Sequence, residues 1–459
     1  MIASHTLSLP RRKVEPSKLS WFRFGALADG VILTTDHGRW HHMPEAEFHA
    51  LLAGEIEPGH PQYDALASKG FLRDQTSLDD VAATVRGRKR YVGVGPQLHI
   101  LHTAGEDGAR LGVETAKEIL DHVMLSTAHQ LEIRVVAPPN THDADLLAFL
   151  LQYGTEKNRY EGKGLTWRYV TDLANVPEAA RSWLVDKKVV VQTRLDGPAA
   201  LHDAQRTTGP DHATVRAAIA ALHAAAATRS RSEWRVQADV HVGAANAHAP
   251  AEVVAELVDA GVRRVRLHPI AEGPNAINAT TFRAFYAGFL DALLASEAAG
   301  APLVDERTAT LATRVLKSDA GGDVDMRSPS AAGLGVLVYD HQGQIFPCEA
   351  ARALNGAGDD MFLLGKAGVL SYKDCMSHAT LRTLAIASVI ESLPGFADHW
   401  STPWCGVDPV AAYAETGDLF ARPHDFSDAG FQFAQIGVFF ERLLQANAET
   451  LATLGRWSA

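Results

Sequence analysis

Histidine and carboxylate side chains at expected strand ends are the residues best suited to chemistry in this chain. The sequence contains 21 histidines. His102, His241 and His268 stand at or near the ends of three expected strands, and Asp196 follows a fourth. Imidazole and carboxylate groups suit zinc or ferrous iron. Since no short spacing such as HExxH supports a metal centre, we keep this metal site as an alternative and assign no catalytic residue.

Cysteine chemistry is restricted by position. The three cysteines are Cys348, Cys375 and Cys405, so the first 347 residues contain none. This excludes a disulfide scaffold and any thiolate metal site in that part of the chain. No GxSxG motif is present, and the glycine-bearing segment at 93–96 precedes a strand, which is the wrong context for a dinucleotide loop.

Length and composition indicate what kind of folded protein holds these residues. A chain of 459 residues is expected to form two or three domains. It is 46% hydrophobic and 21% charged, which indicates packed cores. The net charge of -11 argues against general nucleic-acid binding. No stretch approaches the length of a membrane span and no signal peptide is evident, so we expect a cytoplasmic protein without a membrane partner.

Strands and helices are expected to alternate between residues 91 and 305. We predict strands at 98–102, 131–137, 165–170, 189–195, 234–242 and 262–269. Helices are predicted at 113–128, 144–153, 177–185, 212–228, 250–259 and 281–297. Six such units predict parallel strands, in a doubly wound sheet or a partial barrel. In both architectures the carboxyl ends of the strands form the ligand-facing rim.

Two smaller units flank this region. Residues 17–75 are expected to fold as a small unit with a β-ribbon and two short helices, which would dock on something larger because its core is small. Residues 325–455 are richer in loops. They are expected to contain a hairpin at 336–347 and helices at 381–390 and 431–451.

Several segments resemble one family. The segment LDGPAALHDAQR at 195–206 resembles the SLDGP...H..R stretch that follows the fourth strand in radical S-adenosylmethionine (SAM) peptide maturases. The resemblance continues in SPSAAGLG at 328–335, in Pro347 and Cys348, and in PWCGVDP at 403–409. Together these segments resemble the His-Xaa-Ser system type of maturase, whose tail is a SPASM-like domain.

This resemblance implies an α/β fold: a partial (β/α)6 TIM barrel of radical SAM type over residues 91–305. It also implies a PqqD-like, winged-helix-like peptide-recognition domain over residues 17–75 and a SPASM-like tail over residues 325–455. Asp196 and Arg206 are then the remnant of the SAM pocket. His268 stands where the resembling proteins usually have an arginine.

The chain departs from the family at its cofactor sites. The CxxxCxxC loop that holds a [4Fe-4S] cluster after the first strand is absent, and VVAPP at 135–139 replaces the GGEP motif. In the tail, Phe396, His399 and Gln432 stand at cysteine positions of the resembling proteins, while Cys348 and Cys405 remain. We therefore expect no [4Fe-4S] cluster, and we expect SAM binding to be lost.

The resemblance and these departures together predict a pseudoenzyme of a ribosomal peptide modification pathway. It would bind a precursor peptide, an active maturase partner, or both, as a heteromer. The peptide would add a strand beside residues 31–34, with Val31, Leu33, Phe48 and Leu51 as the peptide-binding residues. The alternative is a non-radical enzyme that uses the barrel-mouth histidines and Asp196, with a divalent metal or with SAM and no cluster.

Overall fold

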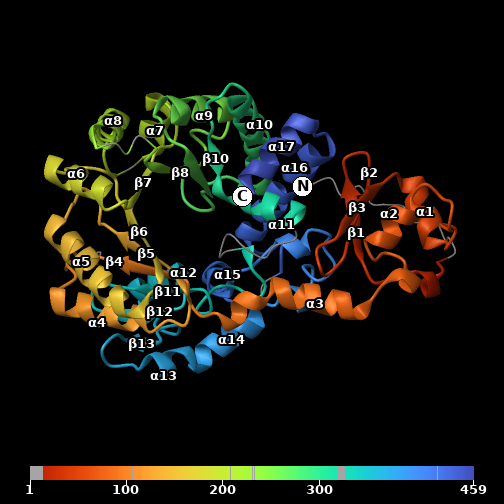
Figure 1. Ribbon diagram of the computed structural model, residues 1–459, viewed down its shortest axis with the longest axis horizontal. Helices are drawn as coiled ribbons and strands as arrows, with labels where there is room; N and C mark the ends of the chain where they lie inside the picture. Colours follow the sequence, from red (N-terminus) through yellow and green to blue (C-terminus); the bar gives the residue numbers. More distant parts are fainter. Residues whose placement is uncertain are drawn as a thin grey trace.

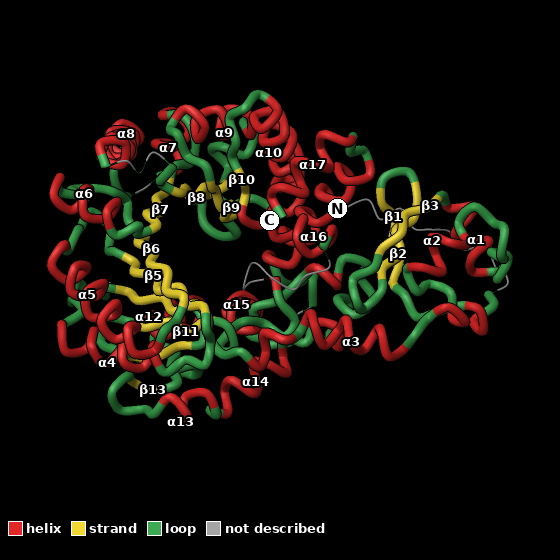
Figure 2. The backbone as a smooth tube through the Cα atoms, in the orientation of Figure 1, coloured by secondary structure: helices red, strands yellow, loops and turns green. Residues whose placement is uncertain are grey.

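The computed structural model describes residues 14–458 except positions 106, 207, 230, 232, 318–325 and 421. One sheet of ten strands, in the order β10-β9-β8-β7-β6-β5-β4-β11-β12-β13, dominates the fold. Figure 2 shows these strands as a curved band with helices along its outer side. Residue 325, the expected first residue of the third unit, lies outside the described residues.

Six parallel strands form the barrel, and the prediction of a large parallel sheet is confirmed. The strands are β4 (Leu98–His102), β5 (Gln130–Val136), β6 (Gly164–Val170), β7 (Val190–Arg194), β8 (Gln237–Val242) and β9 (Arg264–Pro269). The helices that follow them are α4 (Val113–Met124), α5 (Ala144–Glu161), α6 (Glu178–Asp186), α7 (Ala199–Gln205), α8 (His212–Thr228), α9 (Pro250–Asp259) and α10 (Ala279–Ala298). The two-residue β10 (Val304–Asp305) pairs with β9.

Local sequence explains where these helices begin. Side chains of Asp143, Asp211 and Asn278 accept backbone N–H groups at the starts of α5, α8 and α10. Apolar residues on alternate strand positions, such as Leu131, Ile133 and Val135, are buried in the main core. The intervening polar residues therefore face the lumen of the barrel.

The small unit contains a three-stranded antiparallel sheet and two helices. It comprises β1 (Arg23–Leu27), β2 (Gly30–Thr34), β3 (Trp40–Met43), α1 (Glu45–Leu52) and α2 (Tyr63–Ser68). Helix α3 (Leu78–Arg88) runs from this unit toward the barrel (Figure 1). The sequence predicts a ribbon at this place. The structure adds a third strand to it, because residues 40–43 pair with β2.

The tail completes the barrel sheet. Strand β11 (Val336–Tyr339) pairs in parallel with β4, and β12 (Gln344–Phe346) and β13 (Gly365–Lys366) follow it. The predicted hairpin is confirmed, and it joins the sheet of the barrel. The tail helices are α11 (Glu306–Leu316), α12 (Glu349–Gly356), α13 (Tyr372–Met376), α14 (Ala379–Ala387), α15 (Pro409–Thr416), α16 (Ser427–Leu444) and α17 (Ala448–Trp457).

One expected helix, at 431–451, is two helices. Asn447 interrupts it and accepts the N–H of Thr450 to begin α17. Helix α16 packs on α10, and α17 packs on α11. No helix in the described part of the chain is long and apolar enough to cross a membrane.

An aromatic cluster joins the small unit to the tail. The ring of Phe440 on α16 lies 5.2 Å from Trp40 of β3, 5.5 Å from Trp400 and 4.7 Å from Trp404, measured between centroids. Phe440 is fully buried. The two units therefore share one packed interface.

Candidate functional site

Charged and amide side chains cross the lumen of the barrel. Arg168 on β6 donates from Nε to Glu132 on β5 at 2.9 Å and from Nη1 to Gln192 on β7 at 2.7 Å. It also donates to Gln237 on β8. Four neighbouring strands are thus tied through one guanidinium. Sequence reasoning missed these residues, although their alternation with buried apolar residues was visible.

Arg194 and Asp196 form a fixed pair at the carboxyl end of β7. Nε of Arg194 donates to Oδ2 of Asp196 at 2.6 Å, and the N–H of His241 donates to Oδ1 at 2.8 Å. Asp196 is fully buried, and burial raises its pKa. Each carboxylate oxygen therefore accepts one hydrogen bond, and Asp196 holds Arg194 and the end of β8 in place.

The sequence after β7 explains this geometry. Gly197 has a φ of +126°, which the backbone needs to turn directly after Asp196 and which a side chain would strain. Nδ2 of Asn246 donates to the carbonyls of both Asp196 and His241 at 2.9 Å. Nδ1 of His202 accepts the N–H of Asp196 at 3.1 Å. The ends of β7 and β8 are therefore held rigidly together.

Two arginines at this rim have buried N–H groups without acceptors. Arg206 follows α7 and donates from Nε to the carbonyl of Thr208 at 3.1 Å. Nη1 of Arg206 and Nη2 of Arg194 have no hydrogen-bond partner within the described part of the chain. Burial and the neighbouring Arg194 lower the pKa of Arg206. An anionic group placed here would satisfy both guanidinium groups.

Two histidines adjoin these arginines. The rings of His241 and His268 lie 5.3 Å apart, and Nε2 of His268 lies 2.9 Å from Oδ1 of Asp239. Burial, with help from Arg194, lowers the pKa of His241 to about 3, so its imidazole is neutral at physiological pH. Of the four predicted rim residues, the structure brings Asp196, His241 and His268 into one region, together with Asp239, which was not predicted from the sequence.

His102 lies apart from this cluster. It ends β4, and its Nε2 lies 2.9 Å from Oε1 of Glu349 at the start of α12. No three histidine, cysteine, aspartate or glutamate side chains among the described residues lie close enough to hold a metal ion. The three-histidine metal alternative is not supported, because the tail closes over His102 while His241 and His268 face Arg194 and Asp239.

The expected peptide-binding residues lie in the core of the small unit. Val31, Leu33, Phe48 and Leu51 are all buried, with at most 1% of each residue exposed. Strand β2 is also the central strand, paired with β1 on one side and β3 on the other. A peptide cannot add beside residues 31–34, and this prediction is wrong because β3 occupies that edge.

A large cavity lies instead between the three units. It has a volume of about 1150 Å³ and is lined by the β1–β2 turn, the start of α10, α16 and the segments near residues 400 and 425. We call it the chamber. A second cavity of about 200 Å³ shares Ala271, Glu415, Ser427 and Phe431 with the chamber and reaches His268. The two cavities therefore adjoin each other, the first touching the small unit and the second touching the end of β9.

The tail residues predicted to replace cysteines are packed or hydrogen-bonded in the structure. Phe396 is fully buried against Phe433, and His399 stacks on Phe433 with 3.9 Å between ring centroids. Sγ of Cys405 donates to Oε1 of Gln432 at 3.2 Å. Burial raises the pKa of the Cys348 and Cys405 thiols, so both are protonated.

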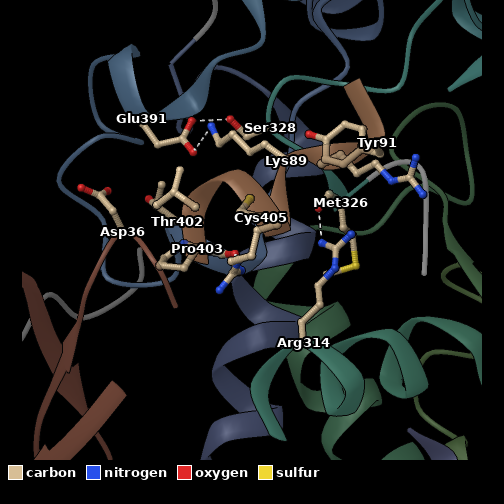
Figure 3. A pocket seen from close by; sticks show the side chains of 13 residues that line it. Asp36, Lys89, Tyr91, Arg314, Met326, Ser328, Glu391, Thr402, Pro403 and Cys405 are labelled. Carbon is tan, nitrogen blue, oxygen red and sulfur yellow. Dashed lines mark hydrogen bonds and ion pairs between the residues drawn. The ribbon is translucent and has the colours of Figure 1, made fainter. Parts of the chain in front are cut away.

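Cys405 also borders a small polar cavity of about 50 Å³ where the three units meet (Figure 3). Lys89 pairs with Glu391 at 2.7 Å there. Arg88 donates to the carbonyls of His37 and Pro403. These groups satisfy one another across the junction, which indicates a structural role.

Comparison with known proteins identifies the fold. Neither a protein-family model nor a curated protein matches the sequence. Native anSMEcpe with bound AdoMet and Kp18Cys peptide has a TM-score of 0.62 at 12% identity, over 79% of this chain and 100% of that one. This chain therefore has the fold of radical SAM peptide maturases.

The second group of similar structures is Streptococcus suis SuiB. SuiB bound to S-adenosylmethionine matches with a TM-score of 0.51 at 11% identity, over 90% of this chain and 99% of that one. SuiB bound to precursor peptide SuiA matches with a TM-score of 0.52 at 12% identity, over 92% of this chain and 100% of that one. The fold prediction is confirmed at this level, and the His-Xaa-Ser subtype stays a prediction.

The cofactor prediction is corrected by these structures. We expected SAM binding to be lost, yet anSMEcpe and SuiB with this fold carry bound SAM. The residues at the barrel mouth fit such a ligand, because the unpartnered N–H groups of Arg194 and Arg206 suit a carboxylate. The sequence lacks the CxxxCxxC motif, and its three cysteines, Cys348, Cys375 and Cys405, are buried.

Proposed function

We propose that this chain binds a precursor peptide in a ribosomal peptide modification pathway and lacks radical catalysis of its own. The observation that carries the proposal is the chamber, which three units line and which adjoins the second cavity beside His268. The anSMEcpe and SuiB structures with bound peptides support it. The peptide would be presented to an active partner maturase in a heteromer.

The proposal divides the chain as the resemblance implies. Residues 17–75 would correspond to a PqqD-like domain, residues 91–305 to the barrel and residues 325–455 to a SPASM-like domain. Peptide contacts would come from the chamber walls, such as Ala28 and Ile277, and not from the buried core of the small unit.

SAM is the second ligand in this proposal. Arg206 and Arg194 would hold its carboxylate, and Asp196 would position Arg194. When bound, SAM supplies an activated sulfonium centre. A non-radical use of SAM is the second candidate function, favoured by the neutral imidazole of His241 beside the two arginines. Incubation of protein, peptide and SAM followed by mass spectrometry distinguishes this candidate, because only an enzyme would change the mass of the peptide.

Peptide binding is tested by blocking the chamber. Ala276 is exposed and lines the chamber ahead of α10. Ala276→Trp is expected to weaken binding at least about tenfold, because the indole occupies space that the peptide needs. The measurement is fluorescence anisotropy with labelled synthetic peptides that cover the short reading frames encoded beside this chain.

The matched control is Ala298→Trp at the other end of α10, where the residue is also exposed and lies away from the chamber. This variant should bind peptide like the native protein. Equal binding by both variants, or no binding by the native chain, would refute the proposal.

Arg206→Ala is expected to weaken SAM binding about tenfold or more, because hydrogen bonds to charged groups contribute about 1.5 to 3 kcal/mol. Isothermal titration calorimetry with SAM measures this. Arg382→Ala, an exposed arginine on α14, is the control and should leave the affinity unchanged. Unaltered affinity in Arg206→Ala would remove Arg206 from the proposed site.

A further inference from the structure

The charged side chains of the chamber are mainly acidic. Its lining contains the carboxylates of Glu415, Asp425 and Glu441 and a single guanidinium, that of Arg283. Nη2 of Arg283 lies 2.5 Å from Oε1 of Glu441, so this cation is already paired. The lining therefore carries an excess of negative charge.

Glu415 has the least compensated carboxylate of the three. Its oxygens accept the N–H of Ser427 at 3.1 Å and the hydroxyl of Ser427 at 2.5 Å. Both donors are neutral, and no cation of the described chain forms an ion pair with Glu415. Asp425, by contrast, pairs at 2.8 Å with Arg422, which lies outside the lining. Glu415 also borders the second cavity, whose lining adds Arg307 and Asp428.

Aromatic rings provide the apolar part of the chamber. His399 and Phe433 stack with an interplanar angle of 6°, and Trp400 and Phe431 line the same cavity. Burial lowers the pKa of His399 to about 4, so the stacked pair is uncharged at neutral pH. Flat uncharged rings favour an apolar or aromatic side chain of a ligand.

We infer that the chamber selects peptide segments in which an apolar or aromatic residue is flanked by lysine or arginine. This inference rests on the proposed function and specifies the chemistry of its peptide. The apolar side chain would pack on the stacked pair His399 and Phe433, while the cation would approach Glu415. Charge complementarity of this kind favours cationic segments and disfavours acidic ones.

The test compares three labelled peptides that differ only in charge: Ala-Lys-Phe-Leu-Lys-Ala, its Gln version and its Glu version. Fluorescence anisotropy at low salt is expected to show at least about tenfold tighter binding of the Lys peptide than of the Glu peptide. Glu415→Gln should weaken binding of the Lys peptide about threefold, since the contact is exposed to solvent. The same variant should leave the affinity for the Gln peptide unchanged.

Asp418→Asn is the matched control, because Asp418 is exposed near Glu415 but does not line the chamber. It should not alter the preference for the Lys peptide. Equal affinity for all three peptides, reduced equally by Ala276→Trp, would overturn the charge inference and leave the peptide-binding proposal intact. If none of the three peptides binds and the peptides encoded beside the chain also do not bind, the charge inference and the peptide-binding proposal are both overturned.

Discussion

Replacing Phe440 by alanine is expected to lower the free energy of unfolding by about 3 to 5 kcal/mol, the usual cost of removing a buried phenylalanine ring. Phe440 is fully buried and touches Trp40, Trp400 and Trp404, which belong to two different units. The cavity left behind would also loosen the small unit from the tail. Urea unfolding followed by tryptophan fluorescence measures the loss, because three indoles surround the mutated ring.

Phe420→Ala is the control for this prediction. Phe420 is 48% exposed, so its removal should change stability by less than about 0.5 kcal/mol. Limited proteolysis provides a second measurement: cleavage near α3 should become faster in Phe440→Ala, since that helix connects the loosened small unit to the barrel. Equal stabilities of the two variants would show that the aromatic cluster does not hold the units together.

The helices and strands of the barrel were predictable from the sequence, because capping residues and the spacing of buried apolar residues indicate the same elements. The helix expected at 212–228 is α8 over the same residues, since Asp211 caps its start and apolar residues recur on one face. The polar residues inside the lumen were harder to interpret. Arg168 and Glu132 alternate with buried residues, but pairing between them depends on strand register.

The candidate site was predictable only in position. Carboxyl ends of parallel strands gather at one rim, which is why Asp196 and His241 lie together. The role of Asp196 could not be foreseen, because its burial depends on Arg194 and on the backbone of the next strand. The chamber carries no local signal, since it is assembled from residues as distant as Ala28, Ile277 and Phe433.

The small unit shows how a missed strand changes a functional prediction. Val31 and Leu33 suit a strand in contact with a ligand if the ribbon has two strands. Residues 40–43 form the third strand, yet the adjacent His41 and His42 interrupt the run of apolar and β-branched residues that usually indicates a strand. Once β3 pairs with β2, the apolar residues of β2 become core and the proposed peptide contacts move to the chamber.

Acidification is expected to destabilise the protein strongly between pH 6.5 and pH 4, because buried neutral histidines must take up protons when it unfolds. His99 and His122 each lie about 3 Å, through Nδ1, from the hydroxyl of Tyr339 in the core. Burial lowers the pKa of His99 to about 3 and that of His122 to about 4, from 6.5. The unfolded chain therefore binds more protons in this interval, and stability present above pH 6.5 is lost as the pH falls.

At pH 5 each of these two histidines should lower the free energy of unfolding by about 2 kcal/mol relative to pH 7, or by about 4 kcal/mol together. Urea unfolding across this pH range measures the loss. In the double variant His99→Gln and His122→Gln the dependence on pH should be weaker by that amount, whatever its stability at pH 7. His248→Gln, at an exposed histidine, should leave the dependence as it is. A double variant with the native pH dependence would show that the energetic cost of acidification arises elsewhere in the chain.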